Sequence, residues 1–125
     1  MNIPVGYATV TPYICVNGAL KFIEFAKNVF GAEEMFKELN NDRTVRHAEI
    51  KIGGSVIMLA EETLKWPAKS GDFFIYVEDA DKTYEKALEE GAASVMPPTD
   101  QSYGRSGGVT DPFGNTWWIT TPPEE

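Results

Sequence analysis

The chain has 125 residues, of which 42% are hydrophobic and 12% aromatic, and its 11 basic and 19 acidic residues give a formal net charge of −8. The length is typical of one compact domain. The acidic balance argues against a partner that is a nucleic acid or an anionic membrane. The single cysteine, Cys15, rules out an internal disulfide and a cysteine-only zinc site. No apolar run approaches the roughly 18 residues of a membrane span, and the N-terminal residues do not resemble a secretory signal. We therefore expect a soluble, cytoplasmic protein.

Two segments about half a chain apart are similar to each other. Residues 16–26 (VNGALKFIEFA) and 77–87 (VEDADKTYEKA) carry the same residue at five matching positions. Each segment follows a strand-like run rich in aromatic residues, and each leads to Gly-Ala, at Gly31 and at Gly91. Two short amphipathic helices can resemble each other by chance, but the shared order and the shared terminators favour an internal repeat.

The first half predicts one helix and four strands. Apolar residues at three- and four-residue spacing predict a helix over about 18–30, which Gly31 can end in a left-handed conformation. Strands are expected over 11–16, 33–39, 44–52 and 55–60. The dipeptide Gly53-Gly54 predicts a two-residue hairpin that pairs Glu49 with Met58.

The second half repeats this order more loosely. A strand over 72–77 precedes a helix over about 80–90, and further strands are expected over 92–96, 105–110 and 116–121. Pro97-Pro98 is expected to end the first of these three strands. Residues 62–71 form a linker between the halves, so the predicted order is βαβββ twice.

Four short segments resemble the vicinal oxygen chelate superfamily, which includes glyoxalase I, bleomycin-resistance proteins and extradiol dioxygenases. They are Thr11-Pro-Tyr13, Phe30-Gly-Ala-Glu33, His47-Ala-Glu49 and Asp111-Pro-Phe-Gly114. The resemblance is to the small single-domain glyoxalase-like branch. It implies an α+β fold in which two βαβββ modules form an incomplete curled sheet or barrel around a cavity, with the helices outside. The expected single domain is 1–125, with module one at about 8–61, the linker at about 62–71 and module two at about 72–121. The resemblance also implies a homodimer.

The resemblance further implies where a metal would bind. The metal enzymes of the superfamily take a His, Gln or Glu ligand from the first and the last strand of each module. Counting from the valine before each helix and from each hairpin glycine, the matching positions are Thr11, Met58, Asp72 and Trp118. Only Asp72 offers a strong oxygen ligand. We therefore expect no divalent metal and no other cofactor.

Alternation along the strands predicts which side chains face away from the helices and into the cavity. These cavity residues are Thr11, Tyr13 and Cys15, then His47, Glu49, Lys51 and Met58, and in the second half Asp72, Phe74 and Tyr76. They would form a pocket with aromatic walls and a few polar groups, suited to a flat or partly apolar small molecule.

His47 is the only histidine, and Glu49 lies on the same predicted strand face. Three interpretations stay open: a polar pair at the cavity rim, a pair that contacts a ligand, and an imidazole general base oriented by a carboxylate. His47 and Glu49 are thus the candidate catalytic residues. They could also supply two ligands of a nonstandard metal site.

The remaining candidates are also ambiguous. Trp117 and Trp118 could both belong to the core, but their register favours Trp118 as the stacking surface, with Trp117 directed toward the helix. Arg105, in a glycine-rich segment, suits either an anion clamp or a solvated surface position. Trp66 in the linker could be a lid over the pocket or a plug at the module junction. Cys15 is expected to be packed in a strand, and Glu61-Glu62 to be solvated charge.

The leading functional hypothesis is a small-molecule-binding protein of the bleomycin-resistance type that works without a metal. Its partner would be a small aromatic or amphipathic ligand. The expected ligand-binding residues are Thr11, Tyr13, His47, Glu49, Met58, Asp72, Phe74, Tyr76, Arg105 and Trp118. The alternatives are a metal-dependent lyase, isomerase or dioxygenase with a nonstandard ligand set, and a dimeric scaffold whose cavity is vestigial.

Overall fold

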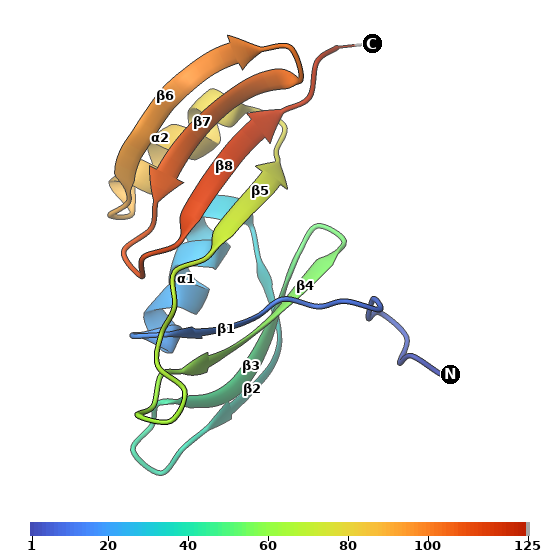
Figure 1. Ribbon diagram of the computed structural model, residues 1–125, viewed down its shortest axis with the longest axis vertical. Coiled ribbons are helices and arrows are strands. Elements are labelled where there is room, and N and C mark those ends of the chain that lie inside the picture. The colour runs from blue at the N-terminus through green and yellow to red at the C-terminus, as the bar shows by residue number, and fades with distance from the viewer. Residues whose placement is uncertain (125) are drawn as a thin grey trace. The chain divides into compact units, whose positions relative to one another are not determined.

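The structure is a computed structural model that describes residues 1–124 (Figure 1). The first half contains β1 (Tyr13–Val16), α1 (Ala19–Phe30), β2 (Glu33–Leu39), β3 (Val45–Ile52) and β4 (Ser55–Glu61). The second half contains β5 (Asp72–Tyr76), α2 (Ala80–Glu89), β6 (Ala93–Gln101), β7 (Gly104–Thr110) and β8 (Thr116–Thr121). The predicted α+β class and the repeated βαβββ order are confirmed.

The two halves form two sheets with the same topology. The strand orders are β1-β4-β3-β2 and β5-β8-β7-β6. In each sheet the first strand pairs in parallel with the last, and the other neighbours are antiparallel. The chain divides into two compact units, the first containing residues 1–27 and 31–69 and the second containing residues 28–30 and the chain from Ser70 onward.

The hairpin at Gly53-Gly54 sets the register of the first sheet. It pairs Ile50 with Ile57 and Glu49 with Met58, as the sequence predicts. Because side chains alternate along a strand, one face of the sheet collects the apolar residues. The fully or nearly fully buried side chains on that face are Val16, Ala48, Ile50, Ile57 and Leu59. His47, Glu49 and Met58 consequently lie on the opposite face.

The N-terminus of α1 is capped by the far end of β4. Gly18 adopts a left-handed conformation and has no side chain to cap the helix. Instead, the carboxylate of Glu61 accepts hydrogen bonds from the backbone N–H groups of Gly18 and Ala19, each at 2.9 Å. Glu62 likewise accepts from the backbone of Ala68 at 3.2 Å. The expectation that these two glutamates are merely solvated charge is therefore wrong, because both accept from backbone N–H groups, which for Glu61 are free N–H groups at the start of a helix.

In the second unit, α2 packs against β6, β7 and β8. Its N-terminus is capped twice, since Asp79 accepts from the backbone of Lys82 and the Thr121 hydroxyl accepts from the backbone of Ala80. Thr121 ends the last strand of its sheet, as Glu61 ends the last strand of the first sheet. In both units, therefore, a side chain at the end of the last strand caps the N-terminus of the helix, although it is a glutamate in the first unit and a threonine in the second.

Trp117 anchors the buried face of the second sheet. Its side chain is 2% exposed and stacks on Phe73 with ring centroids 4.5 Å apart. The indole N–H donates to Asp111 at 2.8 Å, and Asp111 also accepts from the backbone of Phe113 and of Asn115. The turn that precedes β8 is therefore tied to the core through one buried carboxylate.

Two predicted strand boundaries are wrong. The first strand begins at Tyr13, so Thr11 precedes it. Pro97-Pro98 does not end β6, which continues to Gln101 with shifts of register between Ser94 and Thr99. Because β6 is the outermost strand of its sheet and shifts register around the two prolines, it can continue past them without the N–H groups that proline lacks. In the described part of the chain, neither helix is long and apolar enough to cross a membrane.

Candidate functional site

The first sheet carries a cluster of polar and aromatic side chains on the face opposite its buried one. We call this the polar face, and it comprises Tyr13, Phe36, His47, Glu49 and Met58, from all four strands. Strand alternation places His47 and Glu49 on one side of β3, and pairing brings Met58 and Phe36 beside Glu49. Tyr13 is in turn the β1 partner of Met58.

Glu49 lies at the centre of this cluster. Its carboxylate accepts a hydrogen bond from the hydroxyl of Tyr7 through Oε1, and Oε2 lies 2.8 Å from Nε2 of His47. The residue is only 9% exposed. The hydrogen bond from Tyr7, and next that from His47, hold the pKa of Glu49 below its usual value. The same contact raises the pKa of Tyr7. Glu49 is therefore ionised at neutral pH and stabilised by two donors.

The ionised carboxylate fixes the tautomer of His47. A carboxylate can only accept hydrogen bonds, so Nε2 of His47 carries a proton, and in the neutral imidazole the lone pair is then on Nδ1. The hydroxyl of Tyr13 lies 3.4 Å from Nδ1, which is long for a hydrogen bond. The rings of Tyr13 and Phe36 lie 5.6 and 6.0 Å from the imidazole. The arrangement can orient the imidazole and offer one basic nitrogen between two aromatic rings.

The second sheet carries aromatic residues on the corresponding face. We call this the aromatic face, and it comprises Phe74, Tyr76 and Trp118, with Tyr103 from the β6–β7 turn. Phe74 contacts Tyr76 edge to face at 5.3 Å and lies 6.1 Å from Tyr103. Phe74, Tyr76 and Tyr103 are 50%, 66% and 49% exposed.

Gly108 makes room for the Trp118 ring. It is the β7 partner of Trp118, and a Cβ at this position would lie 2.6 Å from the indole Cζ3. Such a distance is shorter than van der Waals contact, so the indole can lie across β7 only because this residue is glycine. Trp117, next in sequence, points to the buried face. The prediction that Trp117 faces the helix and Trp118 the opposite side of the strand agrees with this arrangement.

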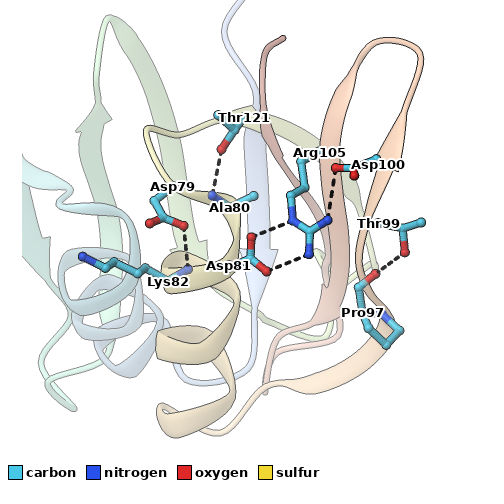
Figure 2. A network of polar contacts seen from close by, with 9 residues as sticks. All are labelled: Asp79, Ala80, Asp81, Lys82, Pro97, Thr99, Asp100, Arg105 and Thr121. Carbon is cyan, nitrogen blue, oxygen red and sulfur yellow. Dashed lines mark hydrogen bonds and ion pairs between the residues drawn. The ribbon is translucent and has the colours of Figure 1, made fainter. Parts of the chain in front are cut away.

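Arg105 lies on the other side of the second sheet from Trp118. Figure 2 shows its guanidinium between Asp81 of α2 and Asp100 of β6. It donates to both oxygens of Asp81 at 2.7 and 3.1 Å and to Asp100 at 3.1 Å. These bonds raise the pKa of Arg105 and lower that of Asp81. The anion clamp considered for Arg105 is not what the geometry shows, because its donors already bind two carboxylates, and we leave it out of the site.

The four positions implied for a metal do not fit one. Thr11 precedes β1, Met58 offers a thioether and Trp118 offers no lone pair, which leaves Asp72 as the one strong oxygen donor. Within residues 1–124, no group of three or more His, Cys, Asp or Glu side chains is arranged to hold a metal ion. His47 and Glu49 are hydrogen-bonded to each other.

Sequence reasoning missed Tyr7 and Phe36. Tyr7 precedes the first strand, in a segment without periodicity, so no pattern could place it beside Glu49. Phe36 is hidden by a shift of register in β2 between Glu34 and Phe36. Of the other candidates, Cys15 is half-buried, and Trp66 is 63% exposed with the Lys65 ammonium 5.5 Å from its ring.

Comparisons with known proteins agree with this architecture. The family model described as Glyoxalase/Bleomycin resistance protein/Dioxygenase superfamily matches residues 6–119. An uncharacterized protein of Mycobacterium bovis is 30% identical over 128 residues, covering 93% of this chain and 84% of that protein.

Two solved structures share the fold at low sequence identity. The crystal structure of TioX from Micromonospora sp. ML1 matches with a TM-score of 0.76 at 19% identity, covering 94% of this chain and 100% of that one. TnmS3 from Streptomyces sp. CB03234, an antibiotic binding protein, matches with a TM-score of 0.71 at 17% identity and the same coverage.

Proposed function

The chain belongs to the Glyoxalase/Bleomycin resistance protein/Dioxygenase superfamily, and we propose that it binds a small aromatic or amphipathic molecule without the help of a divalent metal. The observation that carries the proposal is the aromatic face. Phe74 and Tyr76 are 50% and 66% exposed, although β5, on which they lie, is paired along its length with β8. Large rings held rigidly in contact with water are costly to keep unless something covers them.

Each unit offers its own kind of contact: the aromatic face of the second unit offers stacking, and the polar face of the first unit offers hydrogen bonds. Stacking of a flat molecule on Phe74, Tyr76 and Trp118 contributes about 0.5–1.5 kcal/mol per ring pair beyond the buried area. Three such contacts supply at most about 4.5 kcal/mol, and burial of the apolar area of the ligand can supply the rest of the roughly 8 kcal/mol of a micromolar dissociation constant. His47, Glu49 and Tyr13 provide polar contacts on the first unit, with Met58 beside them. Thr11 and Asp72 lie next to these faces and add lesser contacts.

The comparisons support a binding role only in a general way. TnmS3, which has the same fold, is an antibiotic binding protein. A shared fold does not transfer a ligand, since the chemistry of a site depends on its side chains. The proposal for this chain therefore rests on its own exposed rings. We do not propose a metal-dependent lyase, isomerase or dioxygenase, because three of the four positions implied for metal ligands hold a threonine, a methionine and a tryptophan.

The exposed edges of the sheets favour a homodimer. All seven residues of β2, an edge strand, are exposed, and Met35 and Leu39 are among its apolar side chains. Such an edge invites pairing with a second copy. Sedimentation velocity at micromolar concentration tests this expectation, and a species of the 13.9 kDa chain mass would contradict it.

Fluorescence titration tests the binding proposal. The chain has three tryptophans, and ligands that stack on Trp118 should quench its emission. A panel of flat aromatic and amphipathic compounds is titrated with and without a chelator. Trp118→Phe should remove the response, whereas Trp66→Phe and Arg105→Gln should retain both response and affinity. Binding that appears only after zinc, nickel or iron is added would overturn the metal-free proposal, and a panel without any binder would favour the vestigial scaffold.

A further inference from the structure

In the neutral imidazole of His47, one nitrogen has a lone pair without a good donor. Nε2 of His47 is committed to Glu49 at 2.8 Å, and the other Glu49 oxygen accepts from Tyr7. Nδ1 has only the Tyr13 hydroxyl, at 3.4 Å. The His47 side chain is 27% exposed and that of Glu49 is 12% exposed, so the imidazole can be reached while its carboxylate partner is largely covered.

We infer that the ligand carries a weakly acidic hydroxyl group, a phenol or an enol, and that Nδ1 of His47 accepts its proton on binding. This inference rests on the proposed binding function and names the chemical class of its ligand. The ligand oxygen would lie between Nδ1 and the Tyr13 hydroxyl, in reach of both. Tyr13 and Phe36, 54% and 48% exposed, would contact the ring that bears the hydroxyl.

The proton balance is simple. The ligand O–H bond breaks, an N–H bond forms at Nδ1, and the products are an imidazolium and a phenolate or enolate. Glu49, already ionised, stabilises the imidazolium through Nε2–H, as a carboxylate does for a general base. The Tyr13 hydroxyl can turn its O–H toward the new oxyanion and donate to it. No oxidant, reductant or further reactant is needed.

The charges around His47 select among ligand classes. The ionisable groups on its face are Glu49 and, further along the same strand, Lys51, with Glu38 opposite it on β2, Tyr13 on β1 and Tyr7 from the N-terminal segment. The β4 residue on this face is the neutral Met58. Glu38 also lies 3.6 Å from the exposed Arg46. A carboxylic or phosphoric acid is already ionised at neutral pH, so it would bring no proton for Nδ1 to accept. An aliphatic alcohol is too weak an acid to give up its proton, so phenols and enols remain.

Absorbance spectroscopy with 4-nitrophenol tests the inference, because its phenolate absorbs at longer wavelength than its phenol. The titration is made at a pH at which the free probe is mostly protonated, and 4-nitroanisole serves as the probe without an ionisable proton. We expect a phenolate band on binding. We also expect binding about tenfold tighter than that of the ether, the gain typical of a hydrogen bond between charged groups.

Variants separate proton transfer from a merely structural role. His47→Gln should abolish the phenolate band and bring the affinity for 4-nitrophenol down to that for the ether. Glu49→Gln keeps the shape of the side chain and should weaken the band, and Tyr13→Phe should weaken phenol binding about fivefold. Lys37→Gln, on β2 but on the other side of that strand, should change neither signal. Far-ultraviolet circular dichroism checks that each variant is folded.

The outcomes separate the inference from the binding function. If both probes bind equally and no phenolate band appears, the inference is overturned and the binding function stands. Tighter binding of benzylamine than of 4-nitrophenol would also overturn it, since the polar face would then prefer a cation to a proton donor. If neither 4-nitrophenol nor 4-nitroanisole binds and the fluorescence panel is also negative, the proposed function falls and takes the inference with it.

Discussion

At matching positions of the two sheets, an acid and an imidazole in the first correspond to a glycine and a serine in the second. Glu49 opposes Met58, four residues after a hairpin glycine, and Gly108 opposes Trp118 in the same relation. His47 and Ser106 each lie two residues earlier on their strands. Both sheets have the same strand order and the same parallel pair. The register therefore decides where a side chain lies, but not what chemistry it brings.

The buried faces of the two sheets differ much less. Ile50 and Val109 are both fully buried, as are Leu59 and Ile119 at matching positions of the last strands. A core must stay apolar and filled, whereas the opposite face is free to change as long as water or a ligand covers it. The function of each exposed face therefore has to be interpreted from its own side chains. Single substitutions can test how the buried faces and the exposed faces differ.

The largest effect is expected at the two adjacent tryptophans of β8. Trp117→Phe leaves a gap beside Phe73 and removes the donor to Asp111, and it should lower the free energy of unfolding by about 2–3 kcal/mol. Trp118→Phe, on the aromatic face, should cost clearly less and reduce ligand binding instead. Urea denaturation measures both. Equal losses of stability would show that the two faces are not distinct.

A smaller effect is expected at Gly108. A methyl group there would meet the Trp118 ring at 2.6 and 2.8 Å, so Gly108→Ala should displace the indole and destabilise the unit by about 1–2 kcal/mol. Gly54→Ala is the matched control, since nothing lies within 4 Å of its added Cβ. Thermal unfolding and fluorescence titration follow stability and stacking together. An unchanged ligand affinity in Gly108→Ala would remove Trp118 from the proposed site.

The framework was predictable because it depends on local patterns. The apolar residues at three- and four-residue spacing before Gly31 predicted α1, and Gly53-Gly54 predicted the pairing of Glu49 with Met58. The failure at Pro97-Pro98 has a physical reason, since proline is tolerated in a strand whose outer edge has no partner. Local rules identify elements reliably but do not say which strand becomes an edge.

The polar face was only half predictable. His47 and Glu49 share a strand, so alternation alone places them together. Tyr7 reaches Glu49 from a segment without regular structure, and Arg105 finds two aspartates on neighbouring elements instead of a ligand. Contacts of this kind depend on tertiary packing, which no spacing in the sequence encodes. The pairing of Glu61 with the N-terminus of α1 was missed for the same reason.

The helix caps allow a third comparison between the two units. Glu61→Ala removes the acceptor of two backbone N–H groups and should cost about 1 kcal/mol. Thr121→Val removes one acceptor from α2, which keeps its Asp79 cap, and should cost less. Chemical denaturation of both variants measures the difference. A larger loss for Thr121→Val would show that the Asp79 cap alone does not hold α2.

The smallest effect is expected from the hydrogen bond between Tyr7 and Glu49, and it should depend on pH. Tyr7 is the main cause that lowers the pKa of Glu49 below its ordinary value of 4.5. A group whose pKa is lowered by folding stabilises the folded state above its unfolded pKa, and this stability is lost as the pH falls through the folded pKa. Tyr7→Phe should therefore reduce the free energy of unfolding at neutral pH, and its difference from the wild type should shrink as the pH falls below 4.5.

Urea denaturation at a series of pH values measures this difference. Tyr103→Phe, which removes an exposed hydroxyl beside the aromatic face, is the matched control and should show no such pH dependence. In Tyr7→Phe the pKa of Glu49, followed by carboxyl NMR, should rise toward its ordinary value, because only His47 remains as a donor. A difference in stability that persists unchanged down to about pH 3 would mean that Tyr7 acts by packing and not through the charge of Glu49. The contribution of Tyr7 to the stability of the polar face would then come from packing alone.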